Sequence, residues 1–149
     1  MSINAGFPKN NDYQNDAHYV IAINHPSAAI SRGILNAVGI ELNSATNGIL
    51  LPSMFGELSP NWSITETRHN NHHNEDYFND VNNRLIDNLE AYDEELFIII
   101  RQYKTEQEVQ ETLEKYINND EIVKEELNKI ICDCIFKIKI DLLNGELNL

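Results

Sequence analysis

Three of the five histidines in this chain fall within the stretch RHNNHHNEDYFNDVNNRL, residues 68–85. His69 and His73 are four residues apart, so on a helix they lie on one face, one turn apart. That spacing allows both imidazoles to bind one metal ion. His72 is rotated by about 100° from His73 on such a helix and points elsewhere. The spacing therefore predicts a metal-binding pair and an outlier, which is either solvent-exposed or a spare general base.

The histidine pair extends an apolar stripe. Counting back from Val81 in steps of four gives Tyr77, His73 and His69, which places the pair on the face that turns toward the core. Buried imidazoles need partners, because an unpaired buried polar group costs about 1–3 kcal/mol. A shared metal ion would satisfy both rings, and hydrogen bonds to neighbouring groups are the simpler alternative.

A third metal ligand is available upstream. His18 lies in the apolar run AHYVIAIN, residues 17–24, and His25 follows directly. Two helical histidines and one strand histidine would leave coordination positions open for water and substrate, as catalytic metal sites require. The predicted metal ligands are thus His18, His69 and His73.

Local signals predict the elements that must position these residues. Residues 17–24 are rich in β-branched side chains and predict a strand. Residues 26–39 predict a short helix, with proline at its first position and glycine at its end. Residues 40–52 predict a hairpin or tight turn around an Asn-Gly pair. Ser63 and Glu66 fit a capping box at the start of the helix that carries the histidine pair.

Two or three more helices are predicted beyond the histidine helix. They extend to about Arg101, over residues 105–117 and over residues 120–143, each charged on one face and apolar on the other. Cys132 and Cys134 are two apart in the last of these segments, so they point to different faces and are predicted to be structural, not bridged.

The composition restricts the partners of the chain. Its 24 acidic and 11 basic residues give a net charge of −13 at pH 7, whereas nucleic-acid binders usually carry a basic footprint. A nuclease would need a local positive field, and Arg32 and Arg68 are either phosphate contacts or ordinary exposed arginines. No apolar run reaches the roughly 18 residues of a membrane span. The N-terminus has no signal peptide pattern, so we expect a cytoplasmic protein, unless a dedicated secretion system exports it.

Three strings then match a known pattern in order and spacing: DAHYVIAIN, SRGILNAVGIELNSATNGILLP and HNNHHNEDYFNDVNNRL. They resemble the AHH family of predicted nucleases, of the HNH/endonuclease VII superfamily, found as bacterial polymorphic toxin modules. The resemblance covers about residues 16–85. It implies a helix-rich α+β fold with a small ββα-metal (treble-clef-like) core. The expected division is an N-terminal arm (1–16), the nuclease core (17–89) and an acidic C-terminal helical extension packed on the same domain (90–149).

The resemblance also implies roles. His18 matches the first histidine of the family motif, a metal ligand, while His69 and His73 match the helical ligand pair. Asn47 matches the central asparagine of HNH motifs, which orients the general base, although turn geometry alone would explain an asparagine before glycine. The implied cofactor is one divalent ion (Mg, Mn, Ni or Zn), and the implied substrate is DNA or RNA.

The chain departs from the family motif at the general base, because Ala-His-His is replaced by Ala17-His18-Tyr19. Tyrosine, with an ordinary pKa near 10, is almost wholly protonated at pH 7, whereas histidine near 6.5 is mostly the free base. Three alternatives follow. His25 or His72 serves as the base, Tyr19 acts as an activated phenolate, or the domain keeps its fold with little nuclease activity.

Two functions from different classes therefore remain open. The first is a metal-dependent endonuclease, a bacterial toxin or effector that would have an immunity protein. The second is a catalytically weak or inactive HNH-fold module that binds a protein partner, or forms a homo-oligomer, through its C-terminal helices. The acidic residues of these helices would form that surface, or else an ordinary solvated face: Glu94, Glu95, Glu106, Glu108, Glu111, Glu114, Asp120, Glu121, Glu125 and Glu126.

Overall fold

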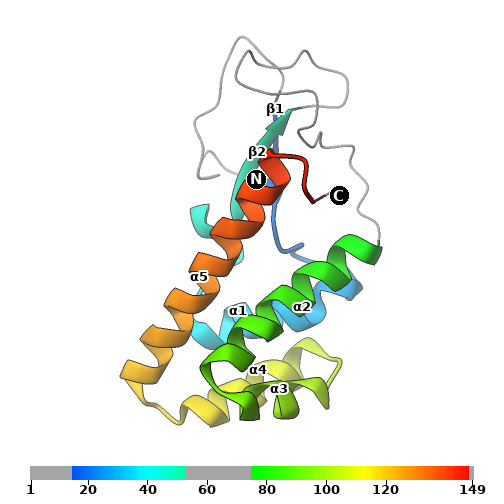
Figure 1. Ribbon diagram of the computed structural model, residues 1–149. Helices are drawn as coiled ribbons and strands as arrows, with labels where there is room; N and C mark the ends of the chain where they lie inside the picture. Colours follow the sequence, from blue (N-terminus) through cyan, green and yellow to red (C-terminus); the bar gives the residue numbers. More distant parts are fainter. Residues whose placement is uncertain (1–14, 53–74, 148–149) are drawn as a thin grey trace.

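A two-stranded antiparallel sheet begins the fold. The computed structural model describes residues 15–52 and 75–147 (Figure 1). Strand β1 (Asn15–Tyr19) pairs with β2 (Gly48–Pro52), with His18 opposite Ile49 and Tyr19 opposite Gly48. The strand predicted over residues 17–24 therefore ends early, at Tyr19. Beyond that residue the backbone is held by polar side chains instead of by a neighbouring strand.

The predicted hairpin within residues 40–52 is wrong, while the alternative of a tight turn there is confirmed. β2 pairs with β1 and not with the apolar residues that directly precede it. A 3-10 turn, η2 (Ala45–Asn47), leads into β2. Ile40 cannot start a hairpin strand because its N–H completes the end of the preceding helix, where it donates to the Leu35 carbonyl.

The first helical segment forms as predicted. A 3-10 turn, η1 (Pro26–Ala28), runs directly into α1 (Ala29–Val38). Gly39 ends the helix with a φ of 83°, a left-handed conformation that glycine adopts at low cost.

Four more helices follow: α2 (Glu75–Tyr92), α3 (Glu94–Arg101), α4 (Glu106–Ile117) and α5 (Glu121–Leu143). The predicted starts at residues 105 and 120 are confirmed as caps. Thr105 accepts from the Glu108 N–H, and Asp120 accepts from two N–H groups of the first turn of α5. Asp93 caps α3 and separates it from α2. The proposed capping box of Ser63 and Glu66 lies outside the described residues.

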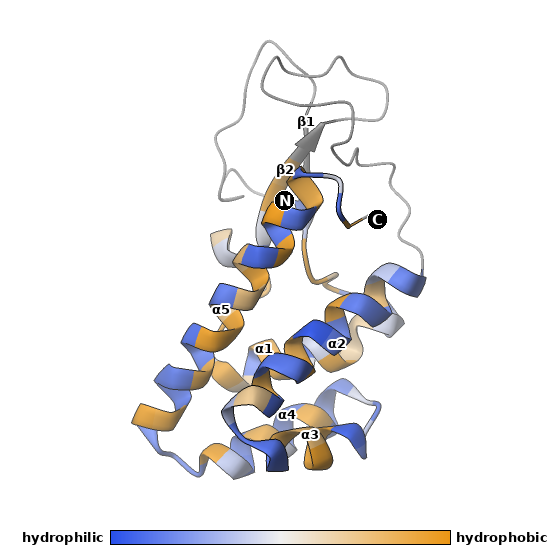
Figure 2. Ribbon diagram, in the orientation of Figure 1, coloured by the Kyte–Doolittle hydropathy of each residue, from blue (hydrophilic) through white to orange (hydrophobic). Residues whose placement is uncertain are grey.

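One cluster of buried apolar side chains draws on the sheet and on all five α-helices. α1 packs against α4 and α5, and α2 packs against α3 and α5. Hydrophilic and hydrophobic residues alternate along α2 and α5 (Figure 2), as expected of helices that bury one face. The C-terminal part of α5 approaches the sheet and contacts η2 (Figure 1). Among the described residues, no helix is long and apolar enough to cross a membrane.

Candidate active site

His18 occupies the next-to-last position of β1, with only 3% of its surface exposed. Tyr19, which ends the strand, is partly exposed, and its hydroxyl donates to Asn43 Oδ1 at 2.7 Å. The Tyr19 hydroxyl is the donor in this bond. The two residues of the family motif thus differ in environment: one imidazole is buried beside the sheet, and one phenol is held by an asparagine.

The fully buried side chain of Asn47 holds the backbone just beyond this motif. Its Oδ1 accepts from the Ile21 N–H at 2.7 Å, and its Nδ2 donates to the carbonyls of Ile21 and Leu42, both at 2.9 Å. The Val20 N–H donates to the Asn47 carbonyl at 2.8 Å. Neither Asn47 nor Gly48 has a positive φ. Turn geometry therefore does not explain the asparagine, whereas its bonds to Ile21 do.

A tyrosine from α2 fixes the preceding carbonyl. Tyr77 is buried, as its place in the apolar stripe predicts, and its hydroxyl donates to the Val20 carbonyl at 2.5 Å. Burial raises the pKa of this phenol well above its ordinary value, with a smaller opposing effect of Arg84. Tyr77 therefore stays a neutral donor, and it ties α2 to the segment that follows β1.

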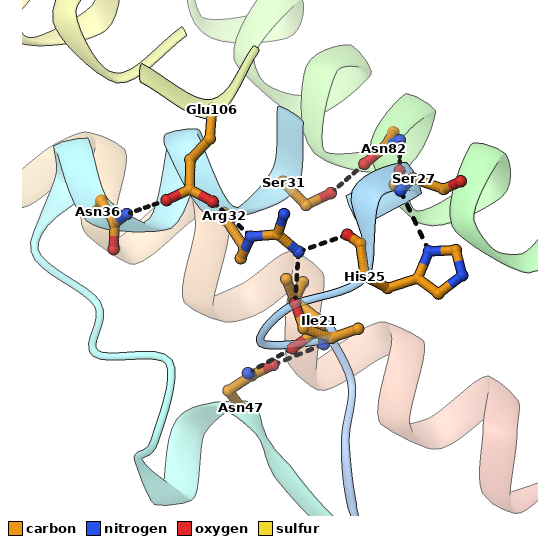
Figure 3. Close-up of polar contacts among 10 residues, drawn as sticks. Ile21, His25, Ser27, Ser31, Arg32, Asn36, Asn47, Asn82 and Glu106 are labelled. Atoms are coloured by element: carbon orange, nitrogen blue, oxygen red, sulfur yellow. Dashed lines mark hydrogen bonds and ion pairs between the residues drawn. The ribbon is translucent and has the colours of Figure 1, made fainter. Parts of the chain in front are cut away.

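Arg32 holds the other end of the same segment (Figure 3). Its Nη1 donates to the carbonyls of Ala22 and His25, at 3.0 and 2.6 Å. Its Nε forms an ion pair with Glu106, the first residue of α4, which also accepts from Asn36 at 3.5 Å. The interpretation of Arg32 as an exposed or phosphate-binding arginine is wrong, because only 9% of its side chain is exposed. The ion-pair partner lies 74 residues away in sequence, so no local signal could have predicted that contact.

His25 acts as a helix cap. Its Nδ1 accepts from the Ser27 N–H at 3.1 Å, and its ring stacks on Phe78 of α2 with centroids 4.2 Å apart. Because the lone pair of Nδ1 is used, the neutral ring carries its proton on Nε2. An imidazole in that state has no free nitrogen to accept a proton. This geometry disfavours His25 as the general base and favours its reading as a helix-entry residue.

The start of α2 is anchored on η1 and α1. The Ser27 hydroxyl lies 2.9 and 2.7 Å from the two carboxylate oxygens of Glu75, the first residue of α2. Asn82 donates to the Ser27 carbonyl at 2.9 Å and accepts from the Ser31 hydroxyl at 2.5 Å (Figure 3). The first residue of α2, Glu75, is therefore held in place by η1.

The described residues supply one of the three predicted metal ligands. His69, His72 and His73 lie outside the described residues, and within residues 15–52 and 75–147 no group of three or more His, Cys, Asp or Glu side chains could hold an ion. His18 fits a ligand role, since it is an imidazole at the edge of a short sheet, on a backbone fixed on its C-terminal side. Imidazole donors suit Zn, Ni, Cu and Fe ions.

The two strands, with α1 between them in sequence and α2 following them, give a helix-rich α+β fold. A family model identifies the class of protein. The chain matches, over residues 4–134, the AHH family, described as a nuclease family of the HNH/ENDO VII superfamily with conserved AHH. The protein therefore belongs to this nuclease family. No curated protein and no solved structure matches the chain.

The extent of the match bears on the C-terminal helices. The three strings noted in the sequence end at about residue 85, whereas the family match runs on through α3 and α4 and into α5. The division into a core of 17–89 and an extension of 90–149 stays a prediction. At the motif that names the family, Tyr19 replaces the second histidine.

Proposed function

We propose that this protein is a metal-dependent endonuclease that hydrolyses phosphodiester bonds of DNA or RNA, acting as a bacterial toxin or effector with a cognate immunity protein. One observation carries the proposal. His18 is buried at the end of β1, directly before a segment whose carbonyls at residues 20, 21, 22 and 25 all accept bonds from side chains. Such a fixed backbone suits a ligand that must hold its geometry during a reaction.

His18, His69 and His73 would hold one divalent ion. When bound, that ion would polarise the scissile phosphate and stabilise the leaving oxygen. Asn47 would act as a positioning residue: its bonds to Ile21 fix the chain two residues beyond Tyr19. Rigid second contacts of this kind commonly tune a metal site.

The general base is assigned by elimination among three candidate residues. The Tyr19 hydroxyl donates to Asn43, and the Nδ1 of His25 accepts from a backbone N–H. Both groups are thus engaged in bonds that oppose proton abstraction. We therefore assign the base to His72, with Tyr19 contributing to substrate placement.

The substitution at Tyr19 also supports a second function. A chain that lacks the histidine its family conserves could retain the scaffold as a catalytically weak module. Its acidic α4 and α5 surfaces would then bind a protein partner or a second copy of the chain.

The test is incubation of the purified protein with plasmid DNA and with RNA, each with Mg²⁺, Mn²⁺, Ni²⁺ or Zn²⁺ and with EDTA. We expect cleavage that needs a metal and is lost in His18→Ala and in His18→Gln. A suitable control is Gln107→Ala, which removes an exposed side chain on α4 that donates to Glu111 one turn further along the same helix. Absence of cleavage in the folded wild type with every metal would overturn the endonuclease and favour the interaction module.

A further inference from the structure

A groove of about 380 Å³, lined by polar side chains and by three isoleucines, opens between α1, α2 and α3. Its polar lining includes Asn79 and Asn83 of α2, together with Arg101, Tyr103 and Lys104 at the end of α3. None of its lining residues carries a carboxylate. In a chain with 24 acidic and 11 basic residues, a groove lined by two cations and no anion is a local reversal of the overall charge.

Arg101 is oriented in this groove before any ligand arrives. Its Nη2 donates to Asn83 Oδ1 at 3.2 Å, and its guanidinium lies 4.8 Å from the centre of the Phe97 ring. These contacts fix the plane of the guanidinium and leave further N–H donors for an anion. Since Asn83 accepts through its oxygen, its amide nitrogen also remains a donor.

Several other cations in the described parts of the chain form ion pairs with carboxylates. Arg32 pairs with Glu106, and both Arg84 and Lys137 pair with Asp141. Within residues 15–52 and 75–147, no ion pair involves Arg101 or Lys104, and Lys104 is exposed. Their charges are therefore available to an anionic ligand.

The groove and the candidate active site share α2. Eight residues separate Glu75, at the start of α2, from Asn83, which corresponds to about 12 Å at 1.5 Å per residue. That length equals roughly three to four base pairs of duplex at 3.4 Å each. Asn82, which lines the groove, also holds Ser27 and Ser31, so the wall on α2 is rigid.

We propose that this groove binds the phosphodiester backbone of the nucleic-acid substrate, with Arg101 and Lys104 as the phosphate-binding cations and the amides of Asn79 and Asn83 as additional donors. The inference rests on the proposed function, because it places a second contact for the same substrate along α2. It also explains how a chain of net charge −13 could bind a polyanion: the contact is confined to a surface that lacks carboxylates.

Binding is measured apart from cleavage. Fluorescence anisotropy with a 20-base-pair labelled DNA duplex and a labelled single-stranded RNA, both in EDTA, gives affinities over a series of salt concentrations. We expect the R101Q/K104Q variant to bind at least one of these probes about 10-fold more weakly at low salt. Its slope of log K against log salt should fall by about 0.9 for each lost phosphate contact on duplex, or 0.7 on single strands.

The matched control is K115Q/K129Q, which removes the same charge from exposed positions on α4 and α5. Wild-type affinity and slope in this control support the groove. Equal losses in both variants would show a net-charge effect and overturn the proposal, as would unchanged binding in R101Q/K104Q or no binding by the wild type. Binding without cleavage under any metal would support the groove while counting against the endonuclease, so the two failures are distinguishable.

Discussion

At the scale of single residues, Asn47 is the most fully used polar side chain near the candidate active site. Both its oxygen and its amide nitrogen bond to Ile21, and the same nitrogen bonds to Leu42. An aspartate of the same shape would keep the acceptor and lose both donors, so the buried carbonyl of Ile21 and the partly buried carbonyl of Leu42 would face a carboxylate. The identity of the side chain, and not only its size, is therefore required.

Asn47→Asp is expected to lower the free energy of unfolding by about 3 kcal/mol, because an unsatisfied buried polar group costs about 1–3 kcal/mol and two carbonyls lose their donor. Urea unfolding followed by circular dichroism measures the change. Asn128→Asp serves as the control, since the Asn128 amide donates to one carbonyl, that of Val38, while its oxygen accepts from the Cys132 thiol. A loss of unfolding free energy at position 47 no larger than the loss at position 128 would argue against the stabilising role of the Asn47 bonds.

Tyr19→His tests the general base. The substitution restores the histidine that the family conserves and removes the hydroxyl bond to Asn43. We expect the rate of metal-dependent cleavage to stay close to that of the wild type, because the base is assigned to His72. Rates with plasmid DNA at pH 7 measure it, with Tyr19→Phe as the control that removes only the hydroxyl. A gain of about 10²-fold or more in Tyr19→His, in the range that general acid–base catalysis commonly supplies, would show that this position holds the base and would overturn the assignment to His72.

At the scale of elements, α4 helps to hold the segment that follows β1 in sequence, residues 20–25. Glu106 at its start pairs with Arg32, and α1 approaches α4 closely at Gly33, where an added Cβ would lie 2.6 Å from the Glu106 carbonyl oxygen. Arg32 then transmits this contact to the carbonyls of Ala22 and His25. A helix distant in sequence thus helps to fix the residues next to the family motif.

Substitutions of the two partners should differ in size. Arg32→Gln leaves two partly buried carbonyls without their donor and an unpaired Glu106, so we expect a loss of about 3 kcal/mol of unfolding free energy. Glu106→Gln removes a carboxylate that is 38% exposed, for which about 1 kcal/mol is expected. Chemical denaturation measures both, with the exposed Glu114→Gln as control. A larger loss of unfolding free energy for Glu106→Gln than for Arg32→Gln would contradict the central role of Arg32 in this contact.

At the scale of the whole molecule, local rules predicted the helices well and tertiary contacts poorly. Pro26, Gly39, Thr105 and Asp120 mark helix ends that depend on neighbours a few residues away, and each is found as expected. The end of β1 at Tyr19 and the burial of Arg32 depend on partners up to 74 residues away. Periodicity contains no information about such partners. Of the candidate site, the burial of Tyr77 followed from its apolar stripe, but its bond to Val20 did not.

The central claim is that three histidines, one from β1 and two from the segment before α2, hold one divalent ion. Elemental analysis of the purified protein, after dialysis against Mn²⁺, Ni²⁺ or Zn²⁺, tests it most directly. We expect about one ion per chain in the wild type and a loss of that ion in His18→Ala, His69→Ala and His73→Ala, with full occupancy in His25→Ala. Unchanged metal content in the first three variants would contradict the site.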